Sequence, residues 1–162
     1  MQDHASEVVQ LFDELRAPLL RYLIGFGLTT DDGEEIAQEV FLALHLHLLK
    51  GKPRDNLRGW IFRVAHNLGL RRRARTRRDA GVDEDAREVH DPSPTPEVSA
   101  YENQERRRVV KVVDALPEQD RQCLMLRAEG LRYREIAEVL EMSLGSVASS
   151  LSRSLMRISR AR

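Results

Sequence analysis

Six arginines stand within eight residues in the run RRRARTRR, residues 71–78. Guanidinium groups at this density suit phosphate groups, because each has a permanent charge and several N–H donors. A run of this kind is also typical of a solvated helix end, so on its own it leaves the two interpretations evenly balanced. The chemistry that it indicates is the binding of a polyanion such as nucleic acid.

Other residues that could do chemistry lack partners at the required spacing. His45 and His47 are two residues apart on an expected helix, so their side chains point in different directions and do not readily share a metal ion. Cys123 lies in an apolar-rich stretch, which is typical of a small buried side chain. Glu34 and Glu35 have no nucleophile beside them, and neither a Walker motif nor GxGxxG is present. The sequence therefore predicts no enzyme, no metal, no other cofactor and no small-molecule substrate.

The net charge of the 162-residue chain is zero, but the charge is unevenly distributed. Residues 1–78 carry a net charge of +3, residues 79–105 carry −8, and residues 106–162 carry +5. Two basic lobes around an acidic connector favour a polyanionic partner. The single cysteine excludes an internal disulfide framework. Without a long apolar stretch or a visible leader, we expect a cytoplasmic protein with no direct membrane insertion.

Apolar residues recur at helical spacing along most of the chain, which predicts an all-α protein. The first expected helix spans residues 8–26, with a kink at Pro18 or a break before it. The second spans 33–49. Asp32 marks its start, because Asp32 has capping-box spacing to Glu35. Its apolar stripe is formed by Ile36, Val40, Leu44 and Leu48. Further helices are expected at 57–75, 101–115, 118–129, 133–140 and 143–160.

The stretch 79–100 has three prolines and the acidic cluster 83–85 but no apolar period, which is typical of a mobile linker. We therefore expect two small helical domains, residues 1–78 and 106–162, joined by a flexible acidic linker at 79–105. In the helix at 57–75, the residues expected on the buried face are Leu57, Trp60, Ile61, Val64 and Leu68.

Residues 133–151 have the pattern of a helix-turn-helix, with Ser143 as the expected N-cap of the second helix. Ala137 suits the point where the two helices approach closely. The apolar positions that would hold them crosswise are Ile136, Leu140, Met142, Val147 and Leu151. Such a second helix fits the major groove and reads base edges from its first turns. The outward side chains are expected to be Ser146, Ser149, Ser150, Arg153 and Arg157. A plain helical hairpin is the alternative, which is disfavoured because residues 143–162 hold four arginines and no acid.

Three segments resemble the extracytoplasmic-function (ECF) sigma factors of bacteria, and their order and spacing make the resemblance specific. They are DDGEEIAQEVFLAL (31–44), LRGWIFRVAHNLGLRRRAR (57–75) and ALPEQDRQCLMLRAEGLRYREIAEVLEMSLGSV (115–147). The resemblance covers about residues 8–78 and 106–160. It implies that the first lobe is sigma region 2, which binds core polymerase and recognises and melts the −10 element. It implies that the second lobe is region 4, which reads the −35 element.

The resemblance implies three partners, which are core RNA polymerase, promoter DNA and an anti-sigma factor. The contacts with polymerase would be made to the clamp helices of the largest subunit and to the flap. Polymerase docking falls on one helix face, spaced i, i+3, i+4 and i+7, at Glu35, Gln38, Glu39 and Leu42. Binding of the −10 element falls on Arg54, Asn56, Arg58, Arg63, Asn67, Arg71, Arg72 and Arg73. Binding of the −35 element falls on Arg132, Tyr133, Ser146, Ser149, Ser150, Arg153 and Arg157.

The chain departs from the family pattern at two places. Ala148 and Ser150 stand where the recognition helix usually carries a Lys and an Arg. Glu141 stands where the turn often has glycine, and because Glu tolerates positive φ poorly, we expect a different turn there. The resemblance also places the acidic linker toward electropositive channels of polymerase, where it would substitute for a polyanion or serve as a plain spacer.

The leading hypothesis is a promoter-specificity subunit without catalytic activity. A stand-alone helix-turn-helix regulator is the first alternative, and it would bind duplex DNA without polymerase, often as a dimer. The lack of a dimerisation heptad disfavours it. A protein-interaction module that no longer reads DNA is the second alternative, supported only by Ala148 and Ser150.

Overall fold

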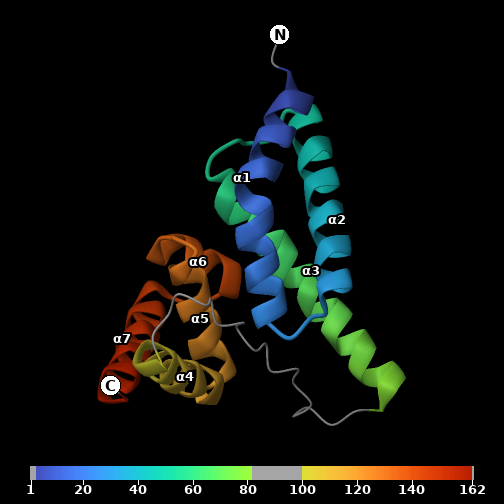
Figure 1. Ribbon diagram of the computed structural model, residues 1–162. Helices are drawn as coiled ribbons and strands as arrows, with labels where there is room; N and C mark the ends of the chain where they lie inside the picture. The colour runs from blue at the N-terminus through green and yellow to red at the C-terminus, as the bar shows by residue number, and fades with distance from the viewer. Residues whose placement is uncertain (1–2, 82–99, 162) are drawn as a thin grey trace. The chain divides into compact units, whose positions relative to one another are not determined.

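The computed structural model describes residues 3–81 and 100–161, and these residues form seven α-helices and no strand. This confirms the predicted all-α class. The chain divides into two compact units, residues 1–89 and 90–162, which are described separately below (Figure 1).

The first unit consists of α1 (His4–Gly25), α2 (Thr30–Leu49) and α3 (Leu57–Ala80). Helices α1 and α2 lie side by side and antiparallel, and α3 packs against both (Figure 1). Large apolar side chains from all three helices fill the core, and each contributes about 1.5–3 kcal/mol by its burial. They include Leu19, Tyr22, Leu23 and Phe26 of α1, Ile36, Val40, Leu44 and Leu48 of α2, and Ile61 and Phe62 of α3. The predicted apolar stripe of α2 is thus confirmed.

Two predictions for the first two helices need correction. The alternative of a break at Pro18 is wrong, because helix α1 continues through Pro18, while the alternative of a kink stays a prediction. A proline inside a helix costs about 3 kcal/mol, but the next turn buries Leu19, Tyr22 and Leu23, and their combined burial outweighs that cost. Helix α2 begins before Asp32, because Thr29 is the N-cap and its Oγ1 accepts a hydrogen bond from the Asp32 amide at 3.1 Å.

The buried face of α3 is displaced from the one that the sequence predicts. It consists of Gly59, Ile61, Phe62, Ala65, His66 and Gly69, whereas Leu57, Trp60, Val64 and Leu68 are only half-buried. The reason is close packing at a small residue, since a Cβ on Gly69 would lie 3.3 Å from Leu23 Cδ2 and 3.4 Å from Phe26 Cε1. An apolar stripe does not reveal a contact that depends on glycine.

The second unit consists of α4 (Ala100–Ala115), α5 (Glu118–Ala128), α6 (Tyr133–Leu140) and α7 (Leu144–Arg160). Helices α5, α6 and α7 pack on one another, and α4 contacts α7. Their shared core is formed by Leu116, Cys123, Leu126, Leu131, Ile136, Val139, Val147 and Leu151. Because α3 extends to Ala80 and α4 begins at Ala100, both ends of the segment 79–105 are helical. The rest of the predicted flexible linker, 82–99, lies outside the described residues.

The turn between α6 and α7 keeps the geometry that a glycine would allow. Glu141 has φ +55° and ψ +50°, so the expectation of a different turn is wrong. A left-handed non-glycine residue costs about 1–2 kcal/mol, which burial of Ile136, Val139 and Val147 offsets. Ser143 is the N-cap of α7, as predicted, and its Oγ accepts from the Ser146 amide at 3.1 Å.

Candidate polymerase-docking and nucleic-acid interfaces

The predicted docking residues Glu35, Gln38, Glu39 and Leu42 are all exposed on α2. Leu42 is 62% exposed. Two further leucines, Leu46 and Leu49, continue the exposed face at i+4 and i+7 from Leu42. They are absent from the predicted docking residues, although their helical spacing from Leu42 indicates the same face. Together these residues form the predicted docking face of α2, which is acidic at its N-terminal end and apolar at its C-terminal end.

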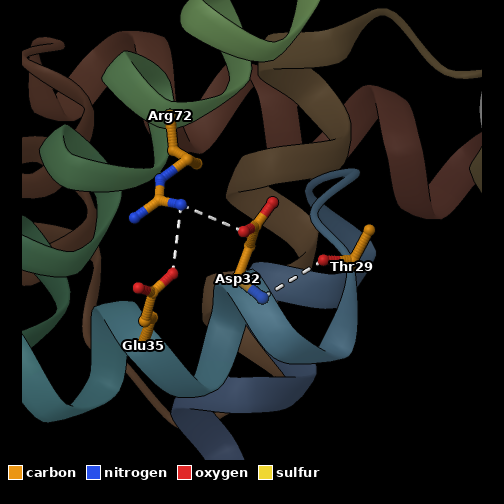
Figure 2. A network of polar contacts seen from close by, with 4 residues as sticks. All are labelled: Thr29, Asp32, Glu35 and Arg72. Carbon is orange, nitrogen blue, oxygen red and sulfur yellow. Dashed lines mark hydrogen bonds and ion pairs between the residues drawn. The ribbon is translucent and has the colours of Figure 1, made fainter.

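Arg72 of α3 is tied to the start of α2 by two ion pairs (Figure 2). Its Nη1 lies 3.1 Å from Asp32 Oδ1 and 3.1 Å from Glu35 Oε2. The Thr29 cap holds the Asp32 backbone in the same turn. In this structure Arg72, predicted as a −10 ligand, therefore connects α3 to a residue of the docking face.

Two other arginines predicted to bind the −10 element also have partners inside the first unit. Arg73 donates a hydrogen bond to the Phe26 carbonyl at 3.3 Å, and its guanidinium lies 4.2 Å from the centre of the Phe26 ring. Arg54 forms an ion pair with Glu7 of α1. Arg58 is half-buried. These contacts give the arginines a role in holding the three helices together.

Asn56 is the N-cap of α3. It has φ +55° and ψ +56°, and its Oδ1 accepts a hydrogen bond from the Gly59 amide at 3.1 Å. A Cβ on Gly59 would lie 2.3 Å from Asn56 Nδ2, so glycine is required for this cap to form. The side-chain carbonyl of Asn56 is thus engaged by the backbone, and its amide group is what remains for a base.

The remaining predicted −10 residues form one line along α3. Arg63, Asn67 and Arg71 are all exposed and are spaced four residues apart, so they lie on one side of the helix. Arg75 and Arg78 continue the exposed basic surface toward the end of α3. We call Arg63, Asn67 and Arg71 the α3 stripe. It combines two permanent cations with an amide that can both donate and accept hydrogen bonds.

A buried polar pair lies beneath this helix. The Tyr22 hydroxyl and His66 Nδ1 are 2.7 Å apart, and both side chains are almost fully buried. The His66 ring also packs edge-on to Phe26, with ring centres 5.4 Å apart. The sequence analysis did not single out His66, although its position one turn after Phe62 indicates the buried face. The pair fixes α3 on α1.

In the second unit, α7 presents Ser146, Ser149, Arg153 and Arg157 to solvent, and Arg132 and Tyr133 are exposed at the start of α6. Ser150 is different, and its predicted outward position is wrong. Ser150 is fully buried, because it falls on the same side of α7 as Val147 and Leu151. Its Oγ donates a hydrogen bond to Asp120 Oδ1 at 2.6 Å.

Asp120 of α5 accepts hydrogen bonds from two residues of α7, the predicted recognition helix. The same Oδ1 that accepts from Ser150 lies 3.1 Å from Arg153 Nη2, and the Asp120 side chain is only 8% exposed. The buried carboxylate therefore joins α5 to two consecutive turns of α7. Charge-assisted hydrogen bonds of this kind are stronger than neutral ones. They fix the rotation of α7 about its axis and hold the Arg153 guanidinium.

Cys123 is fully buried beside this network, as predicted, and burial raises the pKa of its thiol. It behaves as a small apolar side chain. Within residues 3–81 and 100–161, no group of three His, Cys, Asp or Glu side chains could hold a metal ion. In the same ranges, no helix has the length and apolar character needed to span a membrane.

Comparison with known proteins assigns both units. The family model for sigma-70 region 2 matches residues 11–79, and the model for sigma-70 region 4 matches residues 106–158. The two matches follow one another in the order that the sequence analysis predicts. Together they cover nearly all of the described helices.

Individual relatives agree with the two family models. The chain is 32% identical over 126 residues to the ECF RNA polymerase sigma factor SigE of Mycolicibacterium smegmatis, covering 75% of the chain but only 48% of SigE. It is 28% identical to the ECF RNA polymerase sigma-E factor of Escherichia coli K12, covering 81% of the chain and 74% of that protein. The sigma factor RpoE of Bartonella quintana, solved with the anti-sigma factor NepR, has the same fold (TM-score 0.70, 22% identity, 99% and 97% covered). The chain belongs to the sigma-70 family, in its extracytoplasmic-function group.

Proposed function

We propose that this protein is a promoter-specific transcription initiation factor. It binds core RNA polymerase, recognises and melts the −10 element with region 2, and reads the −35 element with region 4. The observation that carries the proposal is the presence of both sigma regions in one chain, in order. Polymerase supplies the catalysis, so the protein is not an enzyme, and it acts in the cytoplasm.

The docking face of α2 is the proposed contact with the clamp helices of the largest polymerase subunit. Exposed Leu42, Leu46 and Leu49 offer apolar area to a partner, while Glu35 and Glu39 offer negative charge at one end. Apolar anchors beside charged residues give a helical interface both affinity and register. Region 4 is proposed to contact the flap of the same polymerase.

The α3 stripe is the proposed contact with the −10 element. Melting is favoured when the protein binds the opened strand more strongly than the duplex, which requires cations for the backbone and a group that recognises an unstacked base. Arg63 and Arg71 supply the cations, and the Asn67 amide supplies the base contact. The other predicted −10 residues, Arg54, Asn56 and Arg58, lie around the start of α3. Arg72 and Arg73 act by holding α3 in place.

Helix α7 is the proposed reader of the −35 element, with its start in the major groove. Ser146 and Ser149 face outward in the first turns, and Arg153 and Arg157 follow. Arg132 and Tyr133 at the start of α6 are placed to contact the DNA backbone, since the first helix of a helix-turn-helix crosses it. Ser150 acts from within, through Asp120.

An anti-sigma factor is the proposed regulator. The related fold of RpoE was solved with one, NepR. The exposed leucines of α2 provide apolar area that such a partner can bury, and covering them would exclude polymerase. A stand-alone regulator is not favoured, because a protein that acts without polymerase does not require region 2 or an exposed face that docks on polymerase.

The test is reconstitution with core polymerase. The full chain and purified bacterial core enzyme should co-elute in size-exclusion chromatography. In transcription from genomic fragments, the mixture should start at discrete sites that core enzyme alone does not use. A folded chain that does not co-elute and changes no start site would contradict the proposal, and tight binding to duplex DNA without polymerase would indicate the stand-alone regulator.

A further inference from the structure

The exposed surface at the start of α7 has no long polar side chain. Between residues 144 and 152, the exposed residues are Leu144, Gly145, Ser146, Ala148, Ser149 and Ser152. The first cation along α7 is Arg153, in its third turn. Direct recognition of guanine or adenine in the major groove usually depends on two hydrogen bonds from one Arg, Lys, Asn or Gln side chain. None of these residue types is present in the first turns.

Four of the polar residues near this surface, Ser143, Ser146, Ser150 and Arg153, are engaged within the protein. Ser143 Oγ accepts from the Ser146 amide and donates to Ser146 Oγ at 2.9 Å, which closes the cap. Ser150 is buried against Asp120, and Arg153 is held by the same carboxylate. Arg153 therefore lies against α5 in this structure, beyond the first turns of α7.

Beside the short hydroxyls of Ser149 and Ser152, the exposed surface at the start of α7 holds an apolar pair. Leu144 and Ala148 are one turn apart on the same side of α7, and Leu144 is 51% exposed. The major-groove edge of a base pair offers one apolar group, the C5-methyl of thymine, and small or branched apolar side chains contact it. We infer that α7 reads the −35 element through thymine methyl groups, with Leu144 and Ala148 as the specificity-determining residues. This inference rests on the proposed function, since it concerns the element that region 4 reads.

The arginines of α7 fit a supporting role. Arg153, Arg157 and Arg160 are spaced i, i+4 and i+7, so they share a side of the helix that is rotated away from Leu144 and Ala148. Arginines beside a groove-reading surface contact phosphates, which fixes the register of the protein without carrying sequence information. Affinity for the backbone and recognition of bases thus come from different sides of α7.

The test uses the reconstituted holoenzyme and a promoter library with a randomised −35 element. Thymines should be enriched at two or more adjacent positions, on one or both strands. The selected promoter is then made with deoxyuridine in place of thymidine at single −35 positions, which removes only the methyl group. Each methyl that is contacted should contribute about fourfold to promoter affinity, from the transfer free energy of one such group.

Protein variants assign the contact. Ala148→Gly and Leu144→Ala should each make the holoenzyme insensitive to deoxyuridine at one position, while Ser159→Ala, an exposed change near the end of α7, should leave the sensitivity unchanged. A holoenzyme that initiates at promoters but selects guanine, or that does not respond to deoxyuridine, would overturn this inference and leave the proposed function intact. A chain that forms no holoenzyme would overturn both.

Discussion

Arg72 Nη1 lies 3.1 Å from Glu35 Oε2 and so connects the helix proposed to bind the −10 element with the face proposed to bind polymerase (Figure 2). The same nitrogen lies 3.1 Å from Asp32 Oδ1 in the first turn of α2. One guanidinium therefore joins α3 to the first turns of α2. Neighbouring arginines in the run 71–78 consequently have different roles, although their side chains are chemically identical.

Replacing Arg71 and Arg72 separately should distinguish these roles. Arg71→Ala removes an exposed cation, so promoter binding by the holoenzyme should weaken and its salt dependence should become shallower by about one counterion. The unfolding of region 2, followed by the fluorescence of Trp60, the only tryptophan, should not change. An unchanged salt dependence would show that Arg71 does not contact DNA.

Arg72→Ala should instead lower the stability of region 2. Its side chain is 23% exposed, so the two ion pairs are partly screened and their loss should cost about 1 kcal/mol. Trp60 fluorescence during urea unfolding measures this cost. Stability equal to that of the wild type, together with a shallower salt dependence, would assign Arg72 to DNA and not to the connection with α2.

Glu39→Arg should abolish binding to core polymerase and leave the fold intact. Glu39 is exposed in the middle of the docking face, and a reversed charge there opposes the proposed complementarity. Asp13→Arg, an equally exposed reversal on α1, is the matched control. Helicity by circular dichroism and co-elution with core enzyme are the two measurements. Undiminished co-elution of a normally helical Glu39→Arg variant would rule out this face as the docking site.

Asn56 offers a test of how much the cap and the positive φ each affect the stability of region 2. Asn56→Ala removes the cap and places alanine at φ +55°, so region 2 should lose about 1–2 kcal/mol. Asn56→Gly removes only the side-chain cap, because glycine adopts the positive φ without strain. The expected loss of stability is about a few tenths of a kcal/mol. Equal losses in the two variants would show that the positive φ does not contribute. The stability of both is followed by Trp60 fluorescence.

Ser150→Ala should destabilise region 4, although Ser150 stands where the family usually has a cation. It removes a buried hydrogen bond to a carboxylate, at a cost of about 1.5–3 kcal/mol. Amide hydrogen exchange in α5 and α7 of the full chain should accelerate. The neighbouring exposed change Ser149→Ala should leave exchange within the range of a surface substitution. Matching exchange rates in the two variants would place Ser150 outside the network.

The helices were predictable because each has an apolar period and end signals. Ser143 stands at a helix start in both the prediction and the structure. The face of α3 was not predictable in the same way, because Gly69 and His66 are buried by contacts with α1 that arise only in the folded unit. The positive φ of Glu141 likewise depends on packing of α6 against α7, which outweighs the preference of a single residue.

The candidate site was predictable by face but not by residue. The spacing of Glu35, Gln38, Glu39 and Leu42 correctly placed them on one exposed side of α2. Within the arginine run, sequence could not separate Arg71 from Arg72 and Arg73, because their difference depends on which acidic or aromatic groups lie opposite in space. Ser150 was placed wrongly although its spacing from Val147 puts it on the buried side of α7; only its partner Asp120, thirty residues earlier, could not be predicted from the sequence.

The most direct test of the central claim is promoter melting. Core polymerase with this chain, bound to a promoter identified by its transcription start site, is treated with permanganate, which modifies unstacked thymines. We expect reactive thymines at the −10 element only when both core enzyme and the chain are present, with a reduced signal for Asn67→Ala. An unreactive −10 element in a complex that contains the chain would show that the protein does not melt promoter DNA.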